Sequence, residues 1–373
     1  MQIVVYLHKN ICVMKHFLIT IVLAVFTAIQ VHAKEAIVDG LRYSLFEDTH
    51  EAMVDFGNKW VGELTIPSEI SVNGQTYTVS KIAWKAFSFC VTLTRVTIPK
   101  TVREIWNDLN EKDLNTSFIG CLNLEAIEVE EGNSSFCSVD GVLFNADTTS
   151  LYAYPAGKKE EHYVVPASVT SIARSAFMLS QSLVTVQIPK GVTCVGYEAF
   201  SNSERLEEVY LPSGITELSG NLFNYCKNLK HVNIPLGVTN IATCAFYGCT
   251  SLRVLDIPKS VTSLGSSTFK ECRFDALVIR GSLEWKNIPE DVFNGMDASS
   301  VIYVQPSEIE KFKKVYQGTV LPLTDYVPSG LSPVTGQSSV SQNHDILFDL
   351  QGRRLTTEPK RGAYIKGGKL RVK

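Results

Sequence analysis

Five phenylalanines recur at a constant spacing of 23 residues, and this period constrains the fold more than any other feature of the chain. The phenylalanines are Phe177, Phe200, Phe223, Phe246 and Phe269. A row of prolines shares the spacing, namely Pro166, Pro189, Pro212, Pro235 and Pro258. Self-similarity at a fixed period of about 20 to 50 residues is typical of solenoids, in which each repeat forms one coil. A solenoid presents long, shallow surfaces, which favours a binding protein over an enzyme.

Each repeat contains two short segments in which apolar and polar residues alternate, such as 232–234 and 238–241. Alternation with a period of two predicts half-buried strands. The repeat proline ends the first strand, because proline has no N–H to donate to a strand ladder. We therefore predict a mostly β solenoid of 23-residue coils with the phenylalanine column in its core.

The charge balance argues against one class of partner. The 373 residues include 35 Lys and Arg against 38 Asp and Glu, and the repeats contain no basic stripe. Nucleic-acid binding requires clustered positive charge, so we expect no nucleic-acid partner.

The N-terminus has the pattern of a secretory signal. A basic residue, Lys15, precedes an apolar run from 17 to 29, and a Val-His-Ala sequence follows as a cleavage-like site. The run is short for a membrane span of about 20 residues. We predict that 1–33 is a signal peptide starting at Met14, and that the exported chain is secreted or at the cell surface without a transmembrane span. A membrane anchor formed by 2–29 is the alternative.

The rest of the chain divides into four parts. They are the N-terminal β cap with the first coil at 34–86, the solenoid at 87–326, a flexible linker at 327–345 and a small C-terminal β tail unit at 346–373. In the cap, Asn73 and Gly74 mark a hairpin turn. An insert at about 130–160 interrupts the period, and such insertions often lie on the binding face of a repeat protein.

The repeat resembles the BspA-type leucine-rich repeat of bacterial surface proteins. The resemblance rests on the pattern Leu-x-x-Val-x-Ile-Pro, Val-Thr-x-Ile, Ala-Phe and Cys-x-x-Leu, and it covers about 37–326. The insert segments 140–144 and 154–157 are similar to a segment common in that family. The family implies a leucine-rich-repeat solenoid, export, and binding to host proteins or other bacterial cells, without catalytic residues. The tail segment 348–355 is similar to C-terminal sorting tails of exported proteins.

Five of the nine cysteines follow a repeat phenylalanine by three residues, namely Cys90, Cys121, Cys226, Cys249 and Cys272. In two other repeats Ser180 and Ser203 take this place. A position that accepts Cys or Ser is expected to be a small buried turn site, so we predict free buried thiols. One or more disulfides are the alternative. A metal site is disfavoured because the chain has no C-x-x-C pair.

No motif for catalysis or cofactor binding is present. The sequence lacks G-x-S-x-G, H-E-x-x-H and a phosphate-binding glycine loop. We therefore expect no enzymatic activity, no cofactor and no metal.

The outward residues of the first strands give the functional hypothesis. Coils stacked about 4.8 Å apart would align these residues into one continuous polar sheet face. Tyr and Arg are favoured anchors in recognition surfaces. The predicted partner-binding face consists of Arg95, Thr97, Gln187, Glu208, Tyr210, His231, Asn233 and Asp256. The alternative is an ordinary solvated face.

These observations predict a non-enzymatic, adhesin-like repeat protein. It would act as a monomer and bind a protein or glycan on a host or bacterial surface. The alternative is a passive structural or spacer component of the cell envelope without a specific ligand.

Overall fold

The structure is a computed structural model that describes residues 34–105 and 117–327, together with four strands of the tail. The predicted signal peptide lies outside the described residues, as does the predicted linker apart from Val327.

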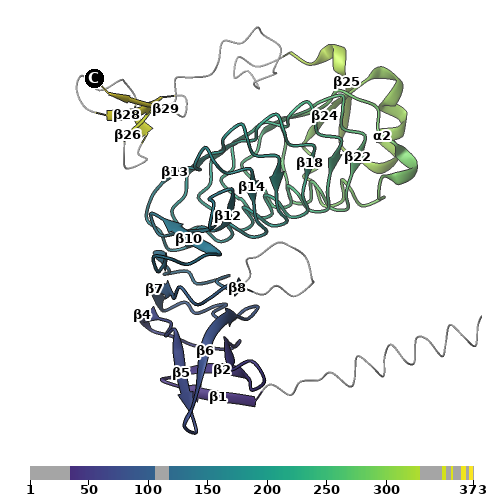
Figure 1. The fold of residues 1–373 in the computed structure, drawn as a ribbon. Coiled ribbons are helices and arrows are strands. Elements are labelled where there is room, and N and C mark those ends of the chain that lie inside the picture. The colour runs from purple at the N-terminus through teal and green to yellow at the C-terminus, as the bar shows by residue number, and fades with distance from the viewer. Residues whose placement is uncertain are drawn as a thin grey trace, which may run out of the picture.

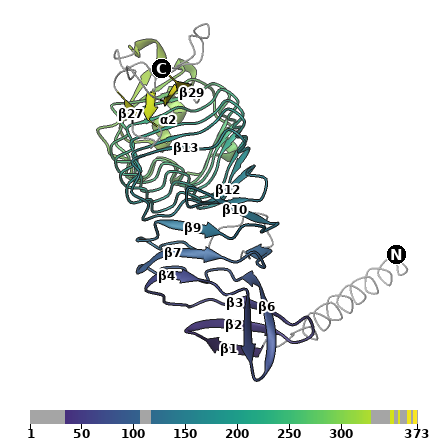
Figure 2. The ribbon, with the colours of Figure 1, turned by 60° about the vertical axis from the view of Figure 1, so that its left-hand side comes forward.

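The chain forms an elongated stack of coils with a change of direction in the middle (Figure 1). We call 34–129 the N-terminal block and 162–327 the C-terminal block. They meet at the insert strands β10 (Phe136–Val139), β11 (Val142–Asn145) and β12 (Ser150–Ala153). The same bend is visible from a second direction (Figure 2). The mostly β solenoid predicted from the 23-residue period is thereby confirmed.

A six-stranded sheet closes the N-terminal end of the stack. Its strands pair in the order β1 (Lys34–Val38), β2 (Leu41–Phe46), β3 (Glu51–Val54), β6 (Gln75–Ile82) and β5 (Glu69–Val72), with β8 (Glu104–Ile105) also on β6. The β5–β6 hairpin turns at Asn73 and Gly74, whose φ angles are 54° and 84°. This is the primed turn that an Asn-Gly pair favours, because both residues need positive φ.

The first strand of each repeat joins a parallel ladder with its neighbours, and these strands fall into three sheets. The sheets contain β4 (Gly62–Thr65), β7 (Leu93–Ile98) and β9 (Ala126–Val129); then β13 (His162–Val164), β15 (Thr185–Gln187), β17 (Glu208–Tyr210) and β19 (His231–Val232); then β21 (Val254–Ile257), β23 (Ala276–Ile279), β24 (Val301–Val304) and β25 (Thr319–Pro322).

The second strands are shorter and also parallel. They are β14 (Ser171–Ile172) and β16 (Cys194–Val195), which continue from β12, and then β18 (Glu217–Leu218), β20 (Asn240–Ile241) and β22 (Ser263–Leu264). From β14 onward, paired strands are aligned so that residues 23 positions apart lie opposite each other, as Asn240 and Ser263 do.

The phenylalanine column lies in the core, as predicted. All five side chains are fully buried, and neighbouring rings stack with centroids 5.1 to 6.2 Å apart. The backbone at these turns forms a third ladder, in which the Phe200 N–H donates to the Leu222 carbonyl at 3.0 Å. Three ladders therefore join successive coils.

The insert divides the core between the two blocks. Val142 and Phe144 pack into the core of the C-terminal block, whereas Leu143 between them packs into that of the N-terminal block. Successive residues of a strand point to opposite faces, so one buried strand can close both cores. The hairpin is joined to the N-terminal block where the Ile127 N–H donates to the Gly141 carbonyl at 2.8 Å.

The cysteine column is buried and hydrogen-bonded, which confirms the prediction of free buried thiols. The thiols of Cys121, Cys226, Cys249 and Cys272 donate to the carbonyl of the phenylalanine in the preceding coil, at 2.9 to 3.1 Å. The Ser203 hydroxyl makes the equivalent bond to Phe177 at 2.7 Å. All eight described cysteines are free.

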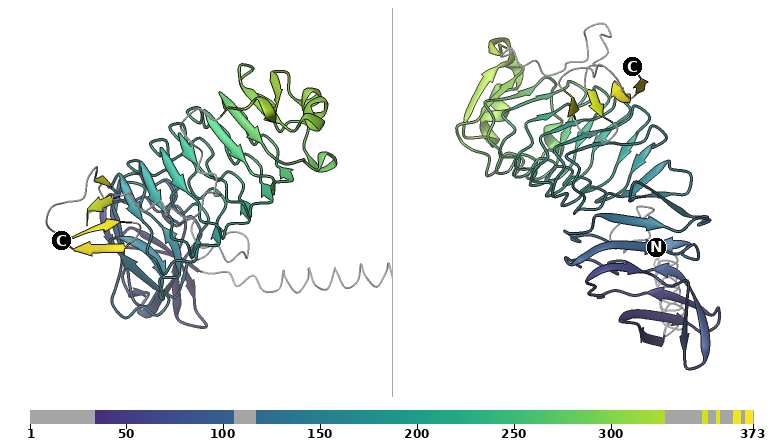
Figure 3. Two further views of the ribbon diagram at one scale, coloured as in Figure 1. Left: turned by 90° about the horizontal axis from the view of Figure 1, so that it is seen from above. Right: turned by 90° about the vertical axis from the view of Figure 1, so that its left-hand side faces the viewer.

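Helical segments close the C-terminal end of the stack, at the green end in Figure 3. They are η1 (Trp285–Asn287), η2 (Pro306–Glu308), α2 (Ile309–Val315) and η3 (Leu323–Asp325). Trp285 packs edge-on against Phe312 with centroids 4.8 Å apart, and its indole N–H donates to Glu308 at 2.7 Å. None of the helices in the described part of the chain has the length and apolar character of a membrane span.

The tail forms an antiparallel sheet of its own. Its strands pair in the order β27 (Arg354–Leu355), β26 (Leu347–Asp349), β28 (Ala363–Lys366) and β29 (Lys369–Val372).

Candidate partner-binding face

The first strands of the C-terminal block place their alternate residues as the sequence predicts. Val186 and Val209 are buried, with 2% and 0% exposed. The residues on either side point outward, and Glu208 lies opposite His231 in the parallel register while Gln187 lies opposite Tyr210. These strands therefore bring together four of the eight predicted residues.

The eight predicted residues do not share one hydrogen-bonded sheet, which corrects the expectation of a continuous face. Arg95 and Thr97 lie on β7, four residues lie on β15, β17 and β19, Asn233 directly follows β19, and Asp256 lies on β21. The insert hairpin contacts β9, so β9 does not pair with β13. The second break follows β19, which ends after Val232.

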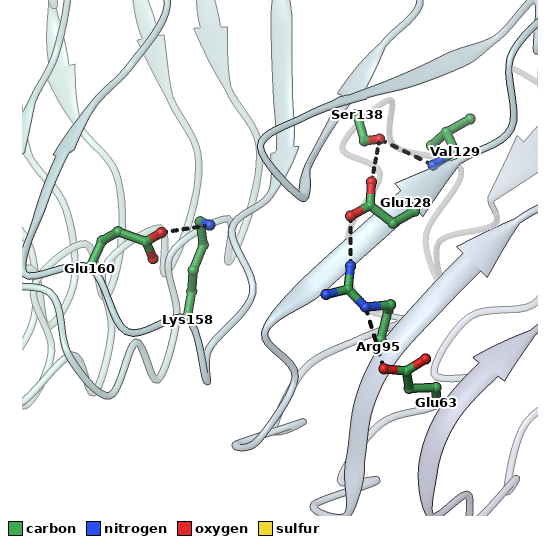
Figure 4. A network of polar contacts seen from close by, with 7 residues as sticks. All are labelled: Glu63, Arg95, Glu128, Val129, Ser138, Lys158 and Glu160. Carbon is green, nitrogen blue, oxygen red and sulfur yellow. Dashed lines mark hydrogen bonds and ion pairs between the residues drawn. The ribbon is translucent and has the colours of Figure 1, made fainter. Parts of the chain in front are cut away.

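Arg95 belongs to a network of polar contacts within the N-terminal block (Figure 4). Its Nη1 lies 2.8 Å from Glu128 Oε1, and its Nε lies 3.7 Å from Glu63 Oε1. The Ser138 hydroxyl donates to the other Glu128 oxygen at 3.3 Å and accepts from the Val129 N–H at 3.1 Å. Arg95 thus joins three coils, and Glu128 extends the network to the insert.

A separate ion pair lies at the end of the insert. The Lys158 ammonium lies 3.0 Å from Glu160 Oε1, and the Lys158 side chain is only 12% exposed (Figure 4). Its shielding from water makes it a structural contact at the junction of the two blocks.

Asn233 and Asp256 are also engaged in structural contacts. The Asn233 amide accepts from the Leu211 N–H at 2.7 Å and donates to the Leu211 carbonyl at 2.8 Å. It therefore continues the ladder where β19 ends. Asp256 accepts two hydrogen bonds from Arg280, which raise the pKa of that guanidinium.

Thr97 lies on β7, opposite Glu128 in the parallel register. The other four residues are Gln187, Glu208, Tyr210 and His231, and we call them the central patch. Tyr210 is 38% exposed, and His231 is also exposed. The Gln187 side-chain oxygen is buried without a hydrogen-bond partner in the structure. The patch combines an aromatic ring, an imidazole, an amide and a carboxylate on strands that hold them in register.

Sequence reasoning missed a second group of surface aromatics, Tyr197, Tyr225 and Tyr247, at the turns that contain the buried phenylalanines. A signal was present, because the three tyrosines occupy variable positions within three residues of the repeat phenylalanine.

Neither surface has the residues of a metal site. Within 34–105 and 117–327, no three His, Cys, Asp or Glu side chains gather so that they could hold a metal ion. The arrangement offers hydrogen-bonding and stacking groups to a ligand on an open surface.

Comparison with known proteins identifies the repeat. The sequence model described as BspA type leucine rich repeat region matches in six copies, over 65–145, 150–275 and 221–316. No protein of curated function matches the chain.

Three solved structures illustrate the similarity. The pneumococcal vaccine antigen PcpA is 19% identical, with 78% of this chain and 98% of that chain covered and a TM-score of 0.48. A leucine-rich repeat protein from Bacteroides ovatus is 21% identical, with 72% and 70% covered and a TM-score of 0.46. A leucine rich cell surface protein from Faecalibacterium prausnitzii is 23% identical, with 73% and 70% covered and a TM-score of 0.36. The sequence identities and TM-scores of these structures are low, so the assignment of the chain to a family rests on the match to the repeat sequence model alone.

Proposed function

This chain belongs to the BspA-type leucine-rich repeat family, and from that premise we propose that it is a non-enzymatic secreted or cell-surface protein that binds a macromolecular partner. The partner is a protein or glycan of a host or bacterial surface, and the chain acts as a monomer in the manner of an adhesin. The observation that supports this function is the presence of two exposed ring side chains, Tyr210 and His231, on the neighbouring strands β17 and β19.

The sheet prepares these side chains for binding. The parallel ladder sets the spacing of β15, β17 and β19, so a partner does not have to order the backbone when it binds. A tyrosine presents a large surface with few rotatable bonds and a hydroxyl that can form a hydrogen bond. Glu208 and Gln187 add polar groups beside it, which suits a partner with its own donors and acceptors.

The structural contacts of Arg95, Asn233 and Asp256 favour a second function, that of a passive spacer. These side chains lie on the predicted face but join neighbouring coils. If the central patch served only the same purpose, the face would need no ligand.

The two proposed functions predict different effects of removing the Tyr210 and His231 side chains. The chain from residue 34 onward is screened against host matrix proteins, glycans and intact bacterial cells, together with the double variant Tyr210→Ala/His231→Ala. We expect the variant to keep its melting temperature and lose binding. The matched control is Glu217→Ala/Thr239→Ala, two exposed residues of the second strands and the turn before them. Absence of binding by the unmodified chain, or equal binding by the double variant, would contradict the proposal.

A further inference from the structure

The turns that contain the buried phenylalanines form a surface of their own, which we call the turn edge. In each turn the residues two places before and two places after the phenylalanine have positive φ, for example Asn221 at 53° and Tyr225 at 54° around Phe223. Positive φ is uncommon for residues other than glycine, and it is retained where the surroundings impose it. Here the Tyr225 N–H donates to the Tyr247 carbonyl at 2.7 Å, so the backbone ladder holds this conformation.

Two glycines allow tyrosine rings to lie close against the next coil. A Cβ atom on Gly220 would lie 2.8 Å from Cε2 of Tyr197, and one on Gly248 would lie 2.7 Å from Cδ1 of Tyr225. Real Cβ contacts are not this short, so any larger residue at either position would displace the ring. The positions of both rings are therefore set by the absence of a side chain in the coil that follows.

Three aromatic rings lie along this edge, with a cation at each end. The Arg174 guanidinium lies 4.8 Å from the centroid of Tyr197. The Tyr225 and Tyr247 rings lie 4.9 Å apart, and the Lys270 ammonium lies 5.2 Å from the Tyr247 centroid. These five residues lie on the turns of five successive coils, a span of roughly 20 Å at the usual strand spacing. We call these five residues the tyrosine row.

The row is neutral overall. Arg174 lies 4.0 Å from Glu198, and the nearby Lys227 lies 2.7 Å from Glu204. Lys270 is followed in the chain by Glu271, whose carboxylate accepts a hydrogen bond from the Tyr247 hydroxyl at 3.1 Å. Since each positive charge has a negative neighbour, the row does not favour a strongly acidic partner.

The row is also poor in exposed aliphatic groups. Of the large apolar side chains that are most exposed, only Tyr197, at 39%, belongs to the row. The others lie elsewhere on the surface. Protein interfaces rely on a desolvated apolar centre, which this surface lacks. Amides accompany the rings instead: Asn221 donates to the Tyr197 hydroxyl, and Asn224 donates to Asn221 at 3.1 Å. Amides suit a partner rich in hydroxyl groups.

We propose that the tyrosine row is a binding surface for a neutral, linear polysaccharide. The C–H face of a pyranose ring is apolar and can pack against tyrosine, while its hydroxyls bond to the amides and carboxylates alongside. An extended glycan repeats at a distance close to the spacing of the coils, so successive sugars can lie along successive turns. This surface is separate from the central patch, and the proposal does not depend on the function assigned to that patch.

The test uses the chain from residue 34 onward and neutral hexasaccharides of β-1,4-linked glucose and of mannose, with heparin as an acidic comparison. Isothermal titration calorimetry measures the affinity of the unmodified chain, of Tyr225→Ala/Tyr247→Ala and of the central-patch variant Tyr210→Ala/His231→Ala. We expect at least one neutral hexasaccharide to bind, with affinity reduced about tenfold in the row variant and unchanged in the central-patch variant.

A second variant distinguishes loss of binding from loss of folding. Tyr197→Ala removes a ring that is 39% exposed and outside the core, so circular dichroism should show an unaltered fold while affinity decreases. Binding of heparin alone, binding of no neutral hexasaccharide, or equal affinity of the row variants would overturn the proposal. Loss of binding in the central-patch variant alone would move the glycan site to that patch.

Discussion

Arg280 donates hydrogen bonds to both carboxylate oxygens of Asp256, at 2.7 Å to Oδ1 and 2.6 Å to Oδ2. The two residues belong to successive coils, and the Asp256 side chain is only 10% exposed. Bidentate pairs of this kind are stronger than single hydrogen bonds. A residue predicted to face a ligand therefore joins two coils of the solenoid.

Asp256→Ala should lower the free energy of unfolding by about 1 to 3 kcal/mol, because it leaves a partly buried guanidinium without its partner. Arg280→Lys should also destabilise the protein, since an ammonium cannot form the planar two-point contact. Denaturation by guanidinium chloride measures both effects. Arg95→Ala is the comparison, because the Arg95 side chain is 42% exposed and surface pairs contribute about 1 kcal/mol or less. Equal effects at the two sites would show that shielding is unimportant.

Two substitutions of Asn233 test how much its hydrogen bonds stabilise the ladder where β19 ends. Asn233→Ala removes both bonds to the Leu211 backbone and should cost about 1 to 3 kcal/mol of stability. Asn233→Asp retains the acceptor but not the donor, so its loss should be smaller if the carboxylate is tolerated. Urea denaturation gives the order of the three proteins. Tyr210→Ala is the control on the same face, and a larger loss there would contradict this role for Asn233.

The repeated residues were predictable because identical positions in successive coils have identical surroundings. A phenylalanine that recurs every 23 residues can only lie above its copies, so the period predicts a buried column. The same reasoning placed the cysteines inside, because Ser203 can replace a cysteine and donate to the same kind of carbonyl.

The contacts between variable residues were not predictable in this way. Asp256 pairs with Arg280 and Asn233 bonds to Leu211, over 24 and 22 residues respectively, so neither pair follows the period. Such pairs depend on where a strand ends and how a long side chain turns. For the same reason the sequence suggested eight binding residues, although at least three of them are engaged in contacts between coils.

The phenylalanine column should carry much of the stability. Phe246→Ala removes a fully buried ring stacked between Phe223 and Phe269, and the cavity should cost about 3 to 5 kcal/mol. Chemical denaturation with a circular dichroism signal measures this loss. Phe89→Ala is the matched control, because that ring is 67% exposed and should cost much less. A denaturation curve unchanged by Phe246→Ala would show that the phenylalanine column is not part of the core.

The buried thiols should make the protein sensitive to alkali. Burial raises the pKa of Cys121 and of Cys272 from 9.0 to about 12, and it raises the pKa of Cys249 well above 9.0. Below about pH 9 a cysteine is protonated in both the folded and the unfolded chain, so it contributes no pH dependence. Between about pH 9 and 12 the unfolded chain loses the proton and the folded chain keeps it. The free energy of unfolding should therefore fall as the pH rises, by about 1 kcal/mol per pH unit for each such thiol.

Cys272→Ser isolates this effect at one position. The serine hydroxyl does not titrate in this range, and Ser203 shows that a hydroxyl can donate to the phenylalanine carbonyl of the preceding coil. The variant should lose less stability than the unmodified protein between pH 9 and pH 11, while buried tyrosines titrate equally in both and cancel. Thermal melts at several pH values measure the difference. Parallel curves for the two proteins would mean that the Cys272 thiol ionises as easily in the folded chain as in the unfolded one.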